Sequence, residues 1–371
     1  MSVTPVAAAG MLGVVGAGTM GAGIAQVALE AGWRVQVFDP FPGAIERGRE
    51  RIADGLRRRA RKLGIEGSAA TAWTAERLDL LHAEDGLGEL ASADLVIEAA
   101  IEDLAAKEAI FAELDAVAGR ATILATNTSA LSIAAIAEAA SRYPERVLGL
   151  HFFNPAPVLL LVEVVAGPRT DPAVAELAAT IVAGWGKTPV RSADSPGFIV
   201  NRVNRPFTIE ALRIVEEGRA RVAEVDAAIR AEGFPMGPFE LMDLVGIDVN
   251  LAAATGVWEG LGRPDRLRPS PIQRSLVAHG RLGRKTGVGF YRYDIGHDQV
   301  IDPLPPDVVS RRRGRSLSPE MIARRIREGI AAEAVLARDE GVASEDDIDT
   351  ALWLGAAHPQ GPFAWARRHD E

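Results

Sequence analysis

A histidine and a glutamate that lie twelve residues apart are the side chains best suited to acid–base chemistry in this sequence. His151 lies in the run His-Phe-Phe-Asn-Pro and Glu163 in the run Leu-Val-Glu-Val-Val, with Pro155 and Pro157 between them. The apolar residues around each indicate two adjacent strands joined by a proline turn, which would bring the two side chains together. A carboxylate on one imidazole nitrogen fixes the tautomer and lets the other nitrogen accept a proton. The alternative is a strand-end histidine bonded to a backbone carbonyl, with a solvated glutamate.

A glycine-rich motif near the N-terminus predicts a dinucleotide site. The apolar strand 12–15 runs into Gly-Ala-Gly-Thr-Met-Gly at 16–21, a helical segment follows, and a second strand closes on Asp39. Such glycines allow a tight turn and let the backbone approach a pyrophosphate at the helix N-terminus, while the acid accepts hydrogen bonds from the adenosine ribose. An acid at this place favours NAD over NADP.

Strands and helices alternate through the first half of the chain. A long basic helix is indicated at 47–63, and further strands at 93–99 and 122–125. The alternation predicts a doubly wound, mostly parallel sheet with ligand sites at the carboxyl ends of its strands. Ser129 and His151 both lie at such ends, so both are expected near the reactive ring of the cofactor.

The composition is that of an ordinary globular protein. The chain has 371 residues, 48% of them hydrophobic, and a net charge of −9, which argues against nucleic acid as the main partner. No apolar run approaches the roughly 20 residues that span a membrane, and the start of the chain lacks the basic region of a signal peptide. We therefore expect a cytoplasmic protein without a membrane partner. The absence of cysteine excludes disulfides, thiol catalysis and thiolate metal sites, and no metal site is predicted.

Basic residues are unevenly distributed. From Glu46 to Lys62 there are eight basic residues and three acidic ones. Such a patch on an acidic protein indicates a small anionic ligand or, equally well on charge alone, a solvated helix face. Only four of the 41 basic residues are lysines, namely Lys62, Lys107, Lys187 and Lys285. A lysine that persists among so many arginines could mark a place that needs a compact ammonium group.

Helical periodicity replaces the alternation in the second half. The run Ser-Ala-Asp-Ser-Pro-Gly at 192–197 is typical of a hinge, and Asn201 follows early in the next helix, near the expected cleft. Residues 281–291 form a glycine-rich basic loop with an aromatic end. We expect a dinucleotide-binding domain at 1–193, a helical domain at 194–294, a linker at 295–317 and a second helical segment at 318–371.

The last segment repeats part of the helical domain. Glu210-Ala211 and Val225-Asp226 recur 123 residues later as Glu333-Ala334 and Ile348-Asp349, and a Pro-x-Gly-Pro-Phe turn recurs at an offset of 124. Matching residues at a nearly fixed offset indicate a duplicated helical unit. The second copy has Arg324 where the offset places Asn201, so we expect it to serve packing rather than chemistry.

The sequence closely resembles the L-3-hydroxyacyl-CoA dehydrogenase family over residues 11–294. The motifs that carry the resemblance are HFFNP, LVEVV, SPGFIVNR, PMGPFELMD and KTGVGFY. The resemblance implies an α/β Rossmann-type domain followed by an all-α domain, and oxidation of the 3-hydroxyl of an acyl-CoA by NAD. It also implies a homodimer, because members often dimerise through the helical domain. The repeat suggests that the second copy packs on the first as a partner subunit would. Short-chain acyl-CoA and 3-hydroxyadipyl-CoA are both compatible substrates.

The resemblance assigns roles to individual residues. His151 would be the catalytic base and Glu163 its orienting partner, while Ser129 and Asn201 would hydrogen-bond the reacting oxygen. The residues expected to contact NAD are Gly16, Gly18, Thr19, Met20, Gly21, Asp39, Glu102, Lys107, Ser129, Asn154 and Lys285. Those expected to contact the acyl-CoA substrate are Lys62 and Ser129. Lys187 is left over and is interpreted as a surface turn residue.

Two residues depart from the family pattern. Gly55 stands where relatives often have a CoA-contacting serine, and Leu160 stands where they usually have a basic residue. Two other functions are considered. A CoA-independent hydroxy-acid dehydrogenase, such as a sugar-acid dehydrogenase, would share the fold, but the basic helix with Lys62 argues against it. A non-catalytic NAD(H)-binding protein is disfavoured by the complete set of candidate active-site residues.

Overall fold

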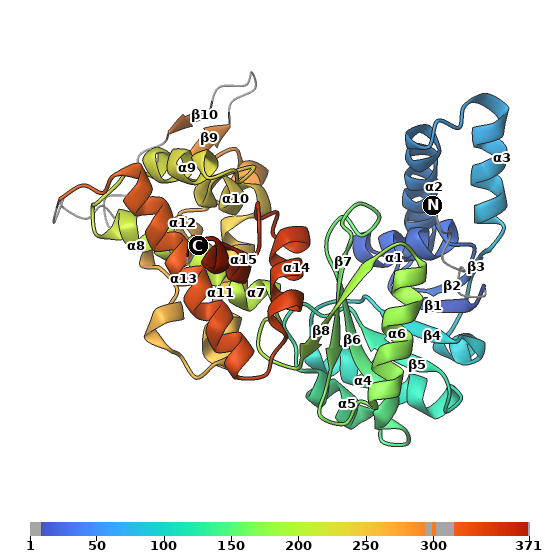
Figure 1. The fold of residues 1–371 in the computed structure, drawn as a ribbon. Helices are drawn as coiled ribbons and strands as arrows, with labels where there is room; N and C mark the ends of the chain where they lie inside the picture. Colours follow the sequence, from blue (N-terminus) through green and yellow to red (C-terminus); the bar gives the residue numbers. More distant parts are fainter. Residues whose placement is uncertain (1–8, 294–298, 302–314, 370–371) are drawn as a thin grey trace. The chain divides into compact units, whose positions relative to one another are not determined.

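The computed structural model describes residues 9–293, 299–301 and 315–369, and the chain forms two compact units (Figure 1). The first unit is Met1–Ser195 and the second is Pro196–Glu371. Their boundary lies two residues beyond the one predicted after residue 193. The predicted linker and the second helical segment both fall within the second unit.

The first unit is built on an eight-stranded sheet with the order β3-β2-β1-β4-β5-β6-β7-β8. Its strands are β1 (Met11–Val15), β2 (Arg34–Phe38), β3 (Leu81–Ala83), β4 (Leu95–Glu98), β5 (Ile123–Thr126), β6 (Val147–Phe152), β7 (Leu161–Ala166) and β8 (Thr188–Ala193). Neighbouring strands are parallel except β6 and β7, which are antiparallel. The doubly wound, mostly parallel sheet is therefore confirmed. The chain crosses from one side of β1 to the other between β3 and β4, which creates the crevice where such sheets bind ligands.

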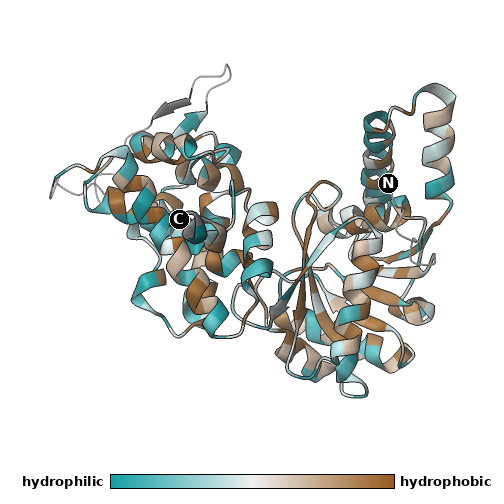
Figure 2. Cartoon of the chain, in the orientation of Figure 1, coloured by the Kyte–Doolittle hydropathy of each residue, from teal (hydrophilic) through white to brown (hydrophobic). Residues whose placement is uncertain are grey.

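Helices cover both faces of this sheet. On one face lie α1 (Thr19–Glu30), α2 (Ala44–Lys62) and α6 (Pro172–Gly184). On the other lie η1 (Leu87–Ser92), α4 (Leu104–Val117) and α5 (Ile133–Ala139). The central strands β1, β4 and β5 are mostly apolar, because both faces of the sheet are covered there, and hydrophobic colour is frequent in the sheet in Figure 2. Helix α2 and the following α3 (Gly67–Leu78) stand side by side in Figure 1 and project beyond the sheet.

The second unit is mainly helical, as predicted. Its α-helices are α7 (Val200–Val203), α8 (Arg205–Glu216), α9 (Val222–Ala231), α10 (Pro238–Val245), α11 (Ile247–Gly260), α12 (Pro271–Ala278), α13 (Pro319–Asp339), α14 (Glu345–Gly355) and α15 (Pro362–His369). A small antiparallel sheet joins β9 (Tyr291–Tyr293) to β10 (Gln299–Ile301). Part of the predicted linker is thus a strand, and its residues 302–314 lie outside the described residues.

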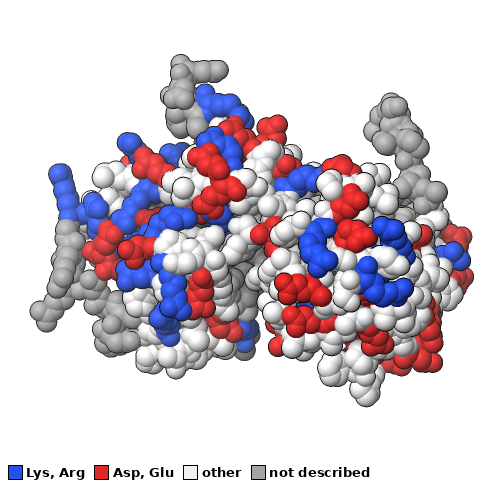
Figure 3. Space-filling view, turned by 90° about the horizontal axis from the view of Figure 1, so that it is seen from below, with Lys and Arg blue, Asp and Glu red and all other residues white. Residues whose placement is uncertain are grey.

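On the face drawn in Figure 3, basic and acidic side chains lie beside one another, in keeping with the ion pairs of both units. Among the described helices, none alone is long and apolar enough to cross a membrane, and only the pair α10 and α11, bent by 103°, reaches that length and composition together.

The predicted repeat shows matching local contacts. Asp226 accepts a hydrogen bond from the Phe239 backbone N–H at 2.9 Å, and Asp349 accepts one from the Phe363 N–H at 2.8 Å. In both places a glycine precedes the capped turn, and a Cβ on Gly237 or Gly361 would come within 2.2 Å of the aspartate. These contacts agree with a duplicated helical unit, which itself stays a prediction.

Candidate active site

His151 and Glu163 face each other across the antiparallel pair of strands β6 and β7. The register pairs these two residues directly, and His151 Nδ1 lies 2.6 Å from Glu163 Oε2. Both side chains are buried, with 5% and 0% of their surfaces exposed. The predicted meeting of the pair is confirmed. An imidazole whose Nδ1 is held by a carboxylate can exchange protons through its other nitrogen, Nε2. The Phe153 ring lies against the imidazole, with 4.5 Å between the ring centroids.

A buried ion pair lies at the ends of the neighbouring strands. Glu98 is the last residue of β4, and its carboxylate accepts hydrogen bonds from Lys107 Nζ at 2.7 and 2.9 Å. The hydroxyl of Thr126, at the end of β5, donates to the same carboxylate at 2.7 Å. The Glu98 carboxylate thus links the carboxyl ends of β4 and β5 to α4. Removing Glu98 or Lys107 would leave an uncompensated charge in the interior. Glu98 and Thr126 were not among the predicted site residues, because no motif distinguishes an acid that ends an apolar strand.

Glu102 links this ion pair to Ser129. Its carboxylate accepts a hydrogen bond from the Thr128 hydroxyl at 2.6 Å and from the Ser129 backbone N–H at 2.9 Å. The other carboxylate oxygen lies 3.4 Å from Lys107 Nζ. Glu102 and Lys107 therefore hold the loop that carries Ser129. The side chain of Lys107 is only 1% exposed, and its predicted contact with NAD stays a prediction.

The glycine motif lies at the crevice beside β1. Gly16 has a φ of +100°, and a Cβ there would lie 2.7 Å from the Ala99 carbonyl oxygen. A Cβ on Gly21 would lie 1.8 Å from the Gly16 carbonyl oxygen, so a larger residue cannot replace it without moving the backbone. Gly18 precedes α1 and supplies no capping side chain. The N–H groups of the first helical turn are the donors that a pyrophosphate takes, so the motif fits NAD.

Asp39 is held directly against this motif. Its carboxylate accepts hydrogen bonds from the Ala17 N–H at 2.7 Å and from the Phe41 N–H at 2.9 Å. The residue follows β2, where the adenosine ribose of a dinucleotide is bound in this fold. A carboxylate fixed at this place accepts from ribose hydroxyls and repels a 2′-phosphate. The geometry therefore supports NAD rather than NADP.

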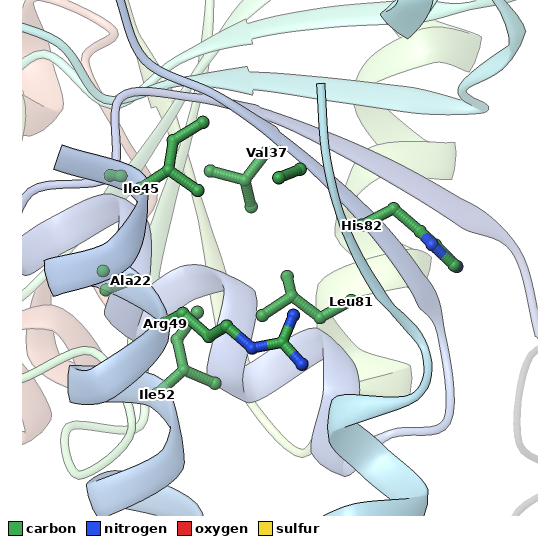
Figure 4. Close-up of a pocket in the computed structure, with 10 residues that line it drawn as sticks. Ala22, Val37, Ile45, Arg49, Ile52, Leu81 and His82 are labelled. Atoms are coloured by element: carbon green, nitrogen blue, oxygen red, sulfur yellow. The ribbon is translucent and has the colours of Figure 1, made fainter. Parts of the chain in front are cut away.

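A small apolar cavity lies between α2 and the strands β2 and β3 (Figure 4). The aliphatic side chains of Val37, Ile45, Ile52 and Leu81 surround it, and the Arg49 guanidinium lies along one side. The cavity belongs to the buried underside of α2. Its apolar lining does not match the anionic ligand that the basic helix predicts.

A larger pocket lies on another side of α2 and matches that ligand better. It has a volume of about 490 Å³, within the usual size of small-molecule sites. Four basic side chains line it, Arg51, Arg58, Arg59 and Lys62, against two acidic ones, Glu30 and Asp54. Helix α1 and the turn 154–158, which begins with Asn154, complete the wall. The predicted basic helix and Asn154 are thus brought to one pocket.

The two departures from the family pattern have different surroundings. A Cβ on Gly55 would lie 1.8 Å from Oε1 of Gln26, whose amide donates to Glu30 at 2.7 Å. The Gln26 side chain therefore occupies the space that a serine at position 55 would need. Leu160 is 48% exposed and lies outside the lining of the larger pocket.

The interpretation of Lys187 as a surface residue was wrong. The residue is 8% exposed, and its Nζ donates to the carbonyl oxygens of Ala156 and, at 2.8 Å, Leu159. Prolines in the turn 155–159 lack N–H groups, so its carbonyls need donors from elsewhere. Burial lowers the pKa of Lys187 to about 8. Lys187 thus anchors the turn that forms one wall of the larger pocket, and the scarcity of lysine was the available signal.

Asn201 and Lys285 belong to the second unit. Asn201 lies on α7, the first helix of this unit, as predicted. Lys285 lies in the short helix η4 (Arg284–Thr286), and its Nζ is 2.6 Å from one oxygen of Asp248. The ion pair lowers the pKa of Asp248. The NAD contact predicted for Lys285 stays a prediction.

Comparisons with known proteins identify the family of this chain. Residues 11–195 match the model of the 3-hydroxyacyl-CoA dehydrogenase NAD binding domain, and residues 197–293 match that of the C-terminal domain. The 3-hydroxyadipyl-CoA dehydrogenase of Escherichia coli (strain K12) is 39% identical over 95% of this chain and 89% of its own length. A 3-hydroxybutyryl-CoA dehydrogenase of Mycobacterium tuberculosis is 44% identical over 76% of this chain and 98% of its own.

Solved structures give the same result. The crystal structure of 3-hydroxybutyryl-CoA dehydrogenase from Escherichia coli K12 matches with a TM-score of 0.85 and 37% identity, covering 97% of this chain and 91% of that one. The (S)-3-hydroxybutyryl-CoA dehydrogenase of Ralstonia eutropha matches with a TM-score of 0.73 and 35% identity, over 77% of this chain and all of that one (100%). The chain belongs to the 3-hydroxyacyl-CoA dehydrogenase family.

Proposed function

We propose that this NAD-dependent dehydrogenase oxidises (S)-3-hydroxyacyl-CoA to 3-ketoacyl-CoA with His151 as general base and Glu163 as its orienting partner. The observation that carries the proposal is the buried 2.6 Å contact between His151 Nδ1 and Glu163 Oε2. His151 lies on β6. The carboxyl end of β6 is at the same edge of the sheet as the glycine motif, which follows the parallel strand β1. The base and the dinucleotide motif therefore belong to one ligand-binding edge.

The chain's residues divide the chemistry between them. His151 Nε2 accepts the proton of the 3-hydroxyl, and Glu163 stabilises the imidazolium that forms. Ser129 and Asn201 hydrogen-bond the substrate oxygen and hold it within reach of the base. NAD, when bound, supplies the acceptor for the hydride that leaves C3. In the reverse direction, protonated His151 returns its proton to the oxygen of the 3-ketoacyl group.

The two ligands would take adjoining surfaces of the first unit, because Thr19 belongs to the glycine motif and also lines the basic pocket. The Gly16–Gly21 motif with Thr19 and Met20 would receive the pyrophosphate of NAD, and Asp39 its ribose. The pocket lined by Lys62 and the arginines of α2 would receive the CoA phosphates, because guanidinium and ammonium groups pair with phosphate. The charge of this pocket is what favours an acyl-CoA over a free hydroxy acid.

The acyl chain is the part of the substrate that needs measurement. The proposal covers 3-hydroxybutyryl-CoA and 3-hydroxyadipyl-CoA, because relatives named for each are similar to this chain. We would measure kcat/KM for a series of (S)-3-hydroxyacyl-CoA thioesters, for 3-hydroxyadipyl-CoA and for the free acids. Preference for a thioester supports the proposal. Equal values for free acids would indicate a CoA-independent dehydrogenase, and no NADH formation with any of them would indicate a binding protein.

We also propose that the second helical segment packs on the first as a partner subunit would. Two sets of ion pairs exchange roles at an offset of 123 residues: Arg202 with Glu333 and Glu340, and Arg325 with Glu210 and Glu217. Such reciprocal contacts are the signature of a self-complementary twofold interface.

Deletion of residues 318–371 tests this packing. The shortened chain should melt at a lower temperature or self-associate through the uncovered face of α8 and α9. Unchanged size and melting behaviour would contradict it. Sedimentation of the full chain shows whether the predicted homodimer forms as well.

A further inference from the structure

Asn201 lies on a helix that is too short to hold itself. Helix α7 spans only Val200–Val203, and so short a helix is not stable without tertiary contacts. The preceding Phe198 is buried and has a φ of +49°, a conformation that residues with a Cβ adopt rarely and keep only where the surroundings enforce it. The position of Asn201 therefore depends on the tertiary contacts that hold α7.

The first contact is made by Arg202, the residue after Asn201. The guanidinium of Arg202 is fully buried, and its Nε donates to Glu333 Oε1 at 2.9 Å. Its Nη1 lies 2.7 Å from Glu340 Oε2. Glu333 belongs to α13 and also binds Arg266 at 2.7 Å, so the carboxylate is itself fixed. Arg202 holds the pKa of Glu340 below its ordinary value.

The second contact is made by Asn204, the C-cap residue of α7. Asn204 Oδ1 lies 2.8 Å from His358 Nε2, which donates to it in the neutral ring. His358 is 2% exposed and packs edge-on against Phe234 and face-on against Trp365. Burial lowers the pKa of His358 to about 3, so the ring is neutral and keeps one N–H to donate. The partners in both contacts, Glu333, Glu340 and His358, belong to the second helical segment.

We propose that the second helical segment is a positioning element for Asn201, acting through Glu333 and Glu340 on Arg202 and through His358 on Asn204. It fixes Arg202, which follows Asn201 in α7, and Asn204, the C-cap residue of α7, and thereby the direction of the Asn201 amide. This goes beyond the packing role expected from the sequence. The inference rests on the proposed role of Asn201 in holding the substrate oxygen.

The chain contains its own matched control. Arg325 stands 123 residues after Arg202 and binds Glu217 at 2.7 Å in the same way that Arg202 binds Glu340. The position that corresponds to Asn201 holds Arg324, which pairs with Glu328 on its own helix at 2.6 Å. Glu340 and Glu217 are similarly exposed, at 49% and 40%. Of these two carboxylates, only Glu340 binds the residue next to Asn201.

The experiment compares Glu340→Gln with Glu217→Gln in the full chain. We expect Glu340→Gln to lower kcat about tenfold, below the ~10²-fold cost of an ångström-scale misplacement, and Glu217→Gln to leave kcat within about twofold. The two variants should bind NADH equally. Equal changes in kcat for both, or no change for either, would overturn the proposal.

A double-mutant cycle with Asn201→Ala separates positioning from a general effect. If the segment acts through Asn201, Glu340→Gln should lower kcat by no more than about twofold once Asn201 is alanine. The same loss in both backgrounds would overturn the proposal. If Asn201→Ala alone leaves kcat unchanged, the role of Asn201 fails and the inference with it. A slow Asn201→Ala beside a silent Glu340→Gln overturns only the inference.

The contact between His358 and Asn204 provides an independent test. His358→Gln can still donate to Asn204 and should keep kcat within about twofold, whereas His358→Leu should lower it about tenfold. Equal kcat for these two variants, with both folded by circular dichroism, would contradict positioning through Asn204.

Discussion

The contact between His151 and Glu163 gives the sharpest prediction, through the substitution Glu163→Gln. Glutamine has the shape of glutamate, and position 163 is fully buried, so the change removes a charge without opening a cavity. If the new amide offers its oxygen to Nδ1, the tautomer is kept but the imidazolium loses its carboxylate. If it offers its N–H, Nδ1 becomes the acceptor, Nε2 carries the hydrogen, and the base cannot accept a proton.

The size of the effect follows from the 2.6 Å contact between His151 Nδ1 and Glu163 Oε2. A hydrogen bond to a charged group is worth about 1.5–3 kcal/mol, and each ~1.4 kcal/mol in a barrier changes the rate tenfold. The loss of charge alone should therefore lower kcat by about tenfold to 150-fold. Inversion of the tautomer would take the loss further, toward the ~10⁴-fold upper range for a general base.

The assay is NADH formation from (S)-3-hydroxybutyryl-CoA, with NADH binding measured by fluorescence. Glu163→Gln should lower kcat and leave the dissociation constant of NADH unchanged, because Glu163 lies on β7 and not in the glycine motif. Glu145→Gln is the control, since that carboxylate is 38% exposed and pairs with Arg120 at 3.4 Å. A folded Glu163→Gln variant whose kcat stays within about twofold of the parent would refute the reasoning.

Two other substitutions test the ligand sites. Asp39→Ala should weaken NAD binding much more than acyl-CoA binding, because the carboxylate lies at the ribose position; equal losses of both, measured by titration, would count against it. Lys187→Met should remove a pH dependence of stability. Burial lowers the pKa of Lys187 from 10.5 to about 8, so its contribution is present above pH 10.5 and is lost as the pH falls through about 8. Urea unfolding of the parent should therefore gain stability between pH 8 and 10.5, by at most about 1.4 kcal/mol per pH unit, and the variant should not. Identical pH profiles would argue that the lysine is solvated.

The sheet and the central pair were predictable because their signals are local. Two apolar runs joined by a short proline turn can hardly form anything but neighbouring antiparallel strands. The separation of twelve positions from His151 to Glu163 then places them opposite each other. The glycine motif with Asp39 is likewise a local strand–turn–helix unit. These features need no knowledge of distant parts of the chain.

Contacts between distant segments were not predictable in the same way. Lys187 lies in a Gly-Lys-Thr-Pro run that looks like an exposed turn, yet its ammonium reaches carbonyls 28 and 31 residues earlier. The matching residues at an offset of 123 were visible in the sequence, whereas the exchange of roles between Arg202 and Arg325 needed the packing of α13. Periodicity carries the fold of each element, and charge pairing across elements has no such period.

The role of His151 as the base of a 3-hydroxyacyl-CoA dehydrogenase can be tested by replacing that residue alone. NADH oxidation with acetoacetyl-CoA is followed for the parent chain and for His151→Ala, together with NADH binding. We expect the parent to turn over, and the variant to lose about 10²-fold to 10⁴-fold in kcat while it binds NADH normally. A variant that binds NADH and keeps the parent's kcat would contradict the claim.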